Sequence, residues 1–159
     1  MSIHINIDPL LDFQQPVLAE LLGIWRGQAN ADVMPRWSVF DPVRIPPRIL
    51  PHLYLIDGLD EKEPRPRWRL LGTHTTDTLG RDNTGKYFDE IYSAEDARDM
   101  SVPVLWVMEK RVPARITGRT RYADMDWLPF ESIYLPYSGN SENVKRILGG
   151  VVYEFDSTK

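Results

Sequence analysis

The clearest hydrophobic pattern in the chain is an apolar stripe near its N-terminus. Its members recur at spacings of one, three and four residues, and they are Val17, Leu18, Leu21, Leu22 and Trp25. This spacing is typical of one face of an amphipathic helix. Pro16 suits a first turn and Gly27 suits a helix end, so we predict a helix over 16–27. Its apolar face must pack either on the rest of the domain or on a protein partner, such as a second copy of the chain.

Alternation of apolar and polar side chains predicts five strands further along, at 53–58, 67–72, 114–122, 127–137 and 146–155. In the second of these, the alternation places Trp68 and Leu70 on one face. Short polar turns separate the last three strands, so we expect them to be antiparallel neighbours. Residues 1–8 alternate only weakly, and at a terminus we interpret them as a loose tail.

A second long helix is predicted between the two groups of strands. Ser93 is followed three residues later by Asp96, which is a capping signal. The helix should run to about Lys110. Its segment 102–108 is apolar almost all round, which indicates burial, and Pro103 should kink or split it. A buried strand at 102–108 is the alternative. A shorter helical turn is expected at 73–77.

The order of elements predicts an α+β domain with a five-stranded antiparallel sheet and helices over one face. We divide the chain into an N-terminal tail at 1–15, a helix with a proline-rich connector at 16–52, and a globular unit at 53–157. In the connector, Asp41 and Pro42 offer an N-cap followed by proline at the first helical position. Gly149 and Gly150 indicate a bulge or a close backbone approach.

Three stretches of the chain hold distinctive motifs. The first holds Trp25-Arg26-Gly27, Met34-Pro35-Arg36 and Asp41-Pro42. The second is Arg67-Trp68-Arg69-Leu70-Leu71-Gly72-Thr73 with the turn Gly80-Arg81-Asp82-Asn83-Thr84-Gly85, and the third is 130–136, ending in Leu135-Pro136. Together they resemble a known family of short bacterial proteins, the PAS-like domains. The resemblance implies a PAS fold of five antiparallel strands with a helical face. It also implies a domain that senses ligands or contacts proteins, and that dimerises through a flanking helix.

Charge and hydropathy limit the classes of partner that we expect. Nineteen basic and 23 acidic side chains give a net charge of −4, which argues against nucleic acid and membrane surfaces as partners. The arginines at 67, 69, 115, 119 and 121 are expected to form ion pairs across strands on a solvated face. No apolar run approaches the ~20 residues of a membrane helix, and no signal-peptide pattern opens the chain, so we expect a cytoplasmic protein.

The sequence requires no cofactor. The absence of Cys excludes disulfides, cysteine nucleophiles and a cysteinyl flavin. Haem is disfavoured because no His falls in the long predicted helix. The glycines of 80–85 lack a dinucleotide-binding spacing and indicate a turn that needs positive φ angles.

A ligand pocket would lie between the sheet and its helices, where the resemblance places a small molecule. It would be apolar with few polar anchors. The candidate lining residues are Trp68, Leu70, Thr73, His74, Leu79, Tyr92, Leu105, Met108, Tyr122, Ile133 and Val151. A filled hydrophobic core is the alternative for the same residues.

Candidate catalytic chemistry is sparse. His74 and Asp77 share a face of a short helix, but two ligands are too few for a structural metal site. The favoured interpretation of His74 is a polar cap or a hydrogen bond to a neighbouring strand. We therefore predict a non-catalytic sensory or regulatory module that binds a small apolar or amphipathic molecule, a protein, or both. The alternatives are a small cone-like α+β enzyme that uses His74, Asp77 or Glu131 as a base, and a purely structural interaction domain.

Overall fold

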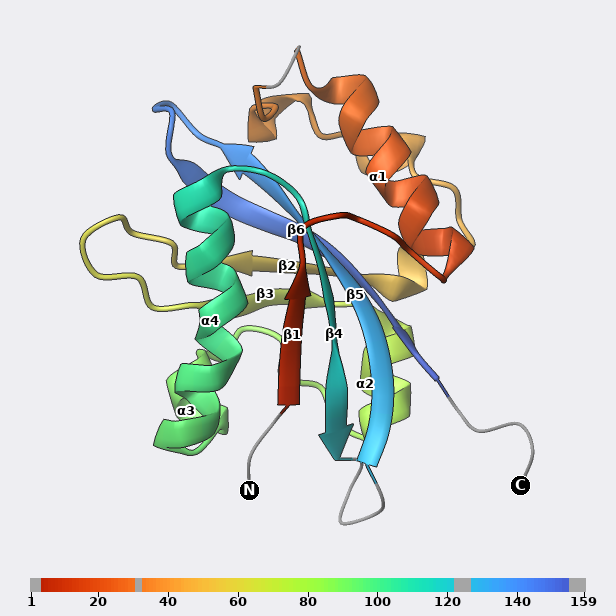
Figure 1. Cartoon of the computed structure of the whole chain (residues 1–159), viewed down its shortest axis with the longest axis vertical. Coiled ribbons are helices and arrows are strands. Elements are labelled where there is room, and N and C mark those ends of the chain that lie inside the picture. The colour runs from red at the N-terminus through yellow and green to blue at the C-terminus, as the bar shows by residue number, and fades with distance from the viewer. Residues whose placement is uncertain (1–3, 31–32, 122–126, 155–159) are drawn as a thin grey trace.

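The fold is built around one antiparallel sheet of six strands. A computed structural model describes residues 4–30, 33–121 and 127–154. The strands are β1 (His4–Asp8), β2 (Leu53–Asp57), β3 (Arg67–Leu71), β4 (Ala114–Arg121), β5 (Trp127–Ser138) and β6 (Val144–Tyr153). Their order across the sheet is β1-β4-β5-β6-β2-β3. The α+β class and the five predicted strands are confirmed, and Figure 1 shows the twisted sheet with its helices.

The sixth strand, β1, corrects the prediction of a loose N-terminal tail. Residues 4–8 pair antiparallel with β4, with Ile7 opposite Ile116 and Asp8 opposite Arg115. The weak alternation is therefore a strand pattern, because Ile5 and Ile7 pack against the hydrophobic core. Pairing with β4 also satisfies backbone groups along a sheet edge that would otherwise be open.

Two long helices form where the sequence predicts them. Helix α1 (Pro16–Gln28) begins at a proline and continues one residue past Gly27. Helix α4 (Ala94–Lys110) is capped by Ser93, whose Oγ accepts a hydrogen bond from the Asp96 N–H at 3.1 Å. Pro103 lies inside α4, which remains one helix, so the alternative of a strand at 102–108 is wrong. The segment is not buried all round, because Val102 is exposed while Val104 and Val107 are buried.

Shorter helices complete the connections. They are η1 (Trp37–Val39), η2 (Pro42–Arg44), η3 (Leu50–His52), α2 (Thr73–Leu79) and α3 (Phe88–Ile91). Asp41 caps η2 as predicted, with its Oδ1 accepting from the Val43 N–H at 3.1 Å. Gly80 and Gly85 have φ angles of 71° and 87°, which confirms the predicted turn. An ion pair of 2.7 Å between Arg67 and Asp57 joins β3 to β2.

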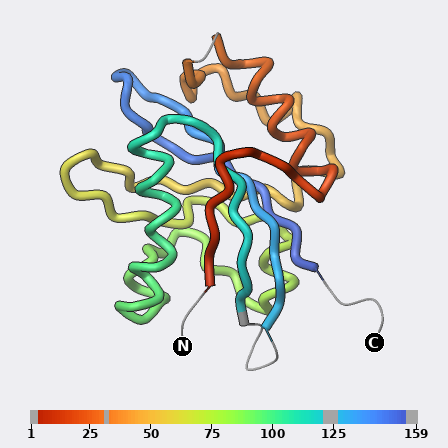
Figure 2. Tube along the Cα trace, viewed as in Figure 1, coloured from red at the N-terminus to blue at the C-terminus, as the bar shows by residue number. Residues whose placement is uncertain are grey.

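Side chains pack directly against two adjacent glycines of β6, one on each face of the sheet. A Cβ at Gly149 would meet the ring of Tyr54 on one face, and a Cβ at Gly150 would meet Leu21 and Leu18 of α1 on the other. We call the Tyr54 side the inner face and the α1 side the outer face. Side chains rather than another backbone segment make these contacts, and the pairing of β6 with β5 has no register shift at either glycine, so neither the predicted bulge nor a close backbone approach is found there. Figure 2 shows how the chain leaves β1 and crosses to enter α1.

Candidate ligand site and the network behind it

A cavity of about 80 Å³ lies at the inner face of the sheet. The sheet supplies one wall, and α2, α4 and the segments on either side of α3 supply the other. The described lining residues are Ile5, Tyr54, Trp68, Leu71, Thr75, Leu79, Asn83, Tyr92, Met100, Ile116, Thr120, Phe130, Ser132, Tyr134, Val151 and Tyr153. Six of the sixteen are aromatic, and none of these side chains carries a charge at neutral pH.

Tyr54 on β2 organises the polar side of the cavity. Its ring packs edge-on against Trp68 at 5.3 Å and against Tyr134 at 5.9 Å. Its hydroxyl bonds to Ser132 Oγ, which in turn donates to the Gly150 carbonyl at 2.7 Å. Burial raises the pKa of Tyr54 and that of Tyr134 above their ordinary values. Both phenols therefore stay neutral at physiological pH and can bond to a ligand without a charge.

Thr75 places an unbonded hydroxyl on the cavity wall. Its side chain is only 5% exposed, and its Oγ1 is one of two buried side-chain polar atoms without a hydrogen bond among the described residues. The other is Asp96 Oδ1, which does not line the cavity. Burial raises the pKa of Tyr153, and the nearby Thr75 hydroxyl opposes this effect. The two groups are therefore close, although no hydrogen bond of ordinary geometry joins Thr75 Oγ1 to any described residue.

Four of the predicted pocket residues lie on this cavity, and they are Trp68, Leu79, Tyr92 and Val151. Thr73 and Leu70 do not. Thr73 is exposed at the start of α2. Leu70 is 52% exposed because of a bulge, since Trp68 pairs with Ile56 while Leu70 pairs with the adjacent Leu55. The extra residue reverses the alternation, so Leu71 faces the cavity instead.

The remaining predicted pocket residues lie elsewhere. Ile133 is buried opposite Gly150 on the outer face, whereas its neighbour Ser132 pairs with Val151 and lines the cavity. Leu105 and Met108 line a separate open groove between α4 and the β5–β6 turn, and Leu105 is 45% exposed there. Tyr122 lies outside the described residues.

His74 is held by the end of β6 rather than by the cavity. Its Nε2 accepts a hydrogen bond from the Tyr153 N–H at 3.2 Å, which confirms the predicted bond to a neighbouring strand. The ring of His52 lies 4.3 Å away, and its Nδ1 bonds to the Val151 carbonyl at 3.0 Å. Burial and the neighbouring His52 lower the pKa of His74, and Asp77 opposes them. This environment favours a neutral imidazole.

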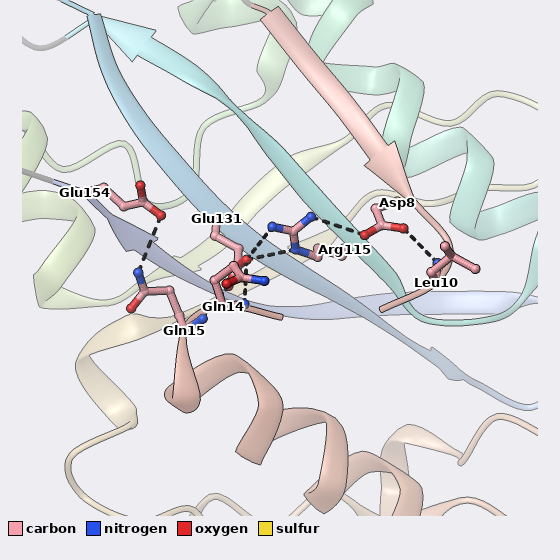
Figure 3. A network of polar contacts seen from close by, with 7 residues as sticks. All are labelled: Asp8, Leu10, Gln14, Gln15, Arg115, Glu131 and Glu154. Atoms are coloured by element: carbon pink, nitrogen blue, oxygen red, sulfur yellow. Dashed lines mark hydrogen bonds and ion pairs between the residues drawn. The ribbon is translucent and has the colours of Figure 1, made fainter. Parts of the chain in front are cut away.

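Glu131 forms a buried network on the outer face, shown in Figure 3. The residue is 1% exposed, and its carboxylate accepts the N–H groups of Gln14 and Gln15 at 3.0 and 2.8 Å. The Arg115 guanidinium contacts the same carboxylate at 2.7 Å and reaches Asp8 at 3.2 Å. Glu131 thus joins β5, β4, the end of β1 and the start of α1.

The structure does not bring the three residues of the enzyme alternative together. Glu131 lies on the outer face, His74 bonds to β6 at the inner side, and Asp77 is exposed on α2. Among the described residues, no cluster of three or more His, Asp or Glu side chains is arranged to hold a metal ion.

The apolar stripe of α1 is buried within the chain. Leu18, Leu21, Leu22 and Trp25 are all less than 10% exposed, and Val17 is half-buried. Trp25 also donates from Nε1 to the Pro136 carbonyl at 2.9 Å. Of the two packing alternatives for this face, the structure adopts the one on the chain's own sheet.

Sequence reasoning missed several cavity residues, chiefly Tyr54, Thr75, Phe130, Ser132, Tyr134 and Tyr153. The missing signal was the parity of β5. Phe130, Ser132 and Tyr134 alternate with Glu131 and Ile133, and choosing the face with a serine and a tyrosine would have found them. Polar tyrosines and a serine did not fit the expectation of an apolar pocket.

Comparison with known proteins agrees with this architecture. A family model described as a PAS domain matches residues 13–152. The chain therefore belongs to the PAS domain family, whose members are in general sensory or regulatory modules. No curated protein and no solved structure gives a significant match. None of the described helices is both long enough and apolar enough to span a membrane.

Proposed function

We propose that this protein is a non-catalytic sensory module that binds a small molecule in the inner-face cavity. The observation that carries the proposal is the cavity itself, which is walled by aromatic rings and has a few fixed polar groups. A largely apolar site with a small number of hydrogen-bonding groups is the usual form of a small-molecule site. The family supports a sensory role in general terms.

The route from input to output follows strand β5. Phe130 and Ser132 line the cavity. The carboxylate of Glu131, between them, accepts hydrogen bonds from the N–H groups of the two residues that precede α1. A ligand that displaces the inner side chains of β5 would also shift the carboxylate behind them. We propose that the output is a change in how the segment 8–16 and α1 are seated, read by a partner protein or a second copy of the chain.

The first test is native mass spectrometry of the full chain after gentle purification, before and after denaturation. A bound mass that is lost on denaturation supports the input site and identifies its ligand. Hydrogen exchange should then show altered protection at both Ser132 and Gln15 when that ligand is added. Protection changes confined to α2 and α4 would contradict the proposed route through β5.

If the purified protein carries no bound mass, the cavity is tested by comparing variants of the chain. Val151→Trp places a large ring in the cavity, whereas Val33→Trp alters an exposed position away from it. If small molecules retained by the wild type and by Val33→Trp are absent from Val151→Trp, the cavity is the site. Equal retention by all three proteins, or no retained or added ligand for any of them, would contradict the proposal.

A further inference from the structure

The cavity points to a particular class of ligand. We infer that it takes a small neutral molecule carrying an oxygen or amide group, which exchanges a hydrogen bond with Thr75. This inference rests on the proposed function and deepens it. It follows from three observations, namely the volume of the cavity, the absence of charge among its described lining residues, and the unbonded hydroxyl of Thr75.

The volume limits the size of the molecule. A cavity of about 150 Å³ takes benzene, and a single water needs about 10–15 Å³. A cavity of 80 Å³ therefore accommodates roughly three to five non-hydrogen atoms with the side chains as they stand. A short alcohol, ketone or amide has this size.

The lining excludes a charged ligand. No described side chain on the wall is an acid, Lys or Arg, and burial keeps Tyr54 and Tyr134 in their neutral forms. A carboxylate or ammonium group would lose its hydration without gaining an opposite charge, which is strongly unfavourable. A neutral polar group loses much less hydration free energy on burial, and one or two hydrogen bonds inside the cavity compensate for that loss.

We expect the hydroxyl of Thr75 to form the hydrogen bond with the polar group of the ligand. Its neighbour Thr76 donates to the Thr73 carbonyl at 3.3 Å, so a threonine of α2 can satisfy its hydroxyl within the helix. Thr75 is a residue of the cavity wall, and its Oγ1 has no hydrogen-bond partner of ordinary geometry among the described residues. A buried unbonded hydroxyl is costly in the empty protein. A ligand that bonds to it would recover that cost, so the ligand's polar atom should lie against α2.

The experiment is an NMR titration of the full chain with four probes of similar size. They are propan-2-ol and acetone as neutral probes, acetate as the anion and isopropylammonium as the cation. The neutral probes should give saturable shifts at Leu71, Leu79 and Val151, with a Kd on the order of millimolar because so few atoms bind. Thr75→Val should raise that Kd about tenfold, whereas Thr75→Ser should restore it.

Each outcome is decisive. Equal or tighter binding of acetate or isopropylammonium at the same resonances would overturn the neutral class while leaving the cavity as a ligand site. Unchanged binding to Thr75→Val would overturn the role of the hydroxyl, whose partner would then be water. If no probe shifts these resonances and Val151→Trp behaves as the wild type in mass spectrometry, the proposed function fails as well.

Discussion

Glu131 and Ser132 are consecutive residues whose side chains lie on opposite faces of the same sheet. Ser132 bonds to Tyr54 beside the cavity, and Glu131 bonds to Arg115 and to the N–H groups that precede α1. A strand alternates its side chains between faces, so one short segment of β5 belongs to both environments. The residue that lines the inner-face cavity and the residue that binds the N-terminal segment are thus joined by a single peptide bond.

Replacing Glu131 with Gln should destabilise the protein by about 3 kcal/mol, because a buried guanidinium loses its closest charge partner. The variant also loses one acceptor for the N–H groups of Gln14 and Gln15. Urea unfolding measures the change in the free energy of unfolding. The matched control is Glu154→Gln at the exposed Glu154, which should stay within about 0.5 kcal/mol. Equal effects of the two substitutions would contradict the structural role of the network.

Thr75→Val should make the ligand-free protein more stable by about 1 kcal/mol, because it removes a buried hydroxyl that has no hydrogen bond. Thermal or urea unfolding in the absence of any additive measures this. Thr76→Val serves as the control, since Thr76 bonds to the Thr73 carbonyl and should give no gain. A loss of stability in Thr75→Val would mean that the hydroxyl has a partner in the ligand-free protein.

Gly149→Ala should cost about 2 kcal/mol of stability, because its Cβ would meet the ring of Tyr54, which the surrounding aromatic rings hold in place. Gly23→Ala is the control. Gly23 lies inside α1 with open space around it, so this change should add about 0.5–1 kcal/mol. Denaturant unfolding of both variants measures the two changes in the free energy of unfolding, which should have opposite signs. A neutral Gly149→Ala would show that Tyr54 can move freely.

Lowering the pH below about 6.5 should weaken the fold through His74. Its pKa is lowered in the folded protein by burial and by His52, so the unfolded chain takes up the proton first. The stability is complete above the ordinary pKa of 6.5 and is lost as the pH falls through the folded value. His74→Gln keeps an acceptor for the Tyr153 N–H and should remove this pH dependence. Urea unfolding between pH 7.5 and 5.5 measures it.

The neighbours of His74 give opposite signs in an NMR titration of its ring. His52→Gln should raise the pKa of His74, because a repelling imidazole is removed, and Asp77→Asn should lower it further. Shifts of the same sign in the two variants would contradict the arrangement of His52, His74 and Asp77.

The sequence predicts element types here better than it predicts faces. The two long helices and five of the strands follow from periodicity and capping, because these signals are local. The pocket depends on which face each side chain takes, and the sequence assigns that face wrongly in two places. A bulge in β3 turns Leu70 outward, and in β5 the apolar Ile133 faces α1 while Ser132 faces the cavity. Both faces of β5 are covered, so hydrophobicity cannot distinguish them.

The tail prediction failed for a different reason. Residues 4–8 gain their structure from pairing with β4, more than a hundred positions away, and five residues carry too little pattern to indicate such a partner. The buried Glu131 was equally hidden. Its partners Gln14, Gln15 and Arg115 come from distant segments, and nothing in the local sequence of β5 marks the carboxylate as buried.

The N-terminal strand β1 belongs to the folded structure although it lies outside the stretch that the family model matches. The family match begins at residue 13, yet Ile5 belongs to the cavity wall and Asp8 to the Arg115 network. A chain cut at residue 13 would uncover the edge of β4 from Arg115 to Arg119, and an open strand edge invites pairing with a neighbouring molecule. Such a fragment would be expected to aggregate, which a truncation at residue 13 would reveal.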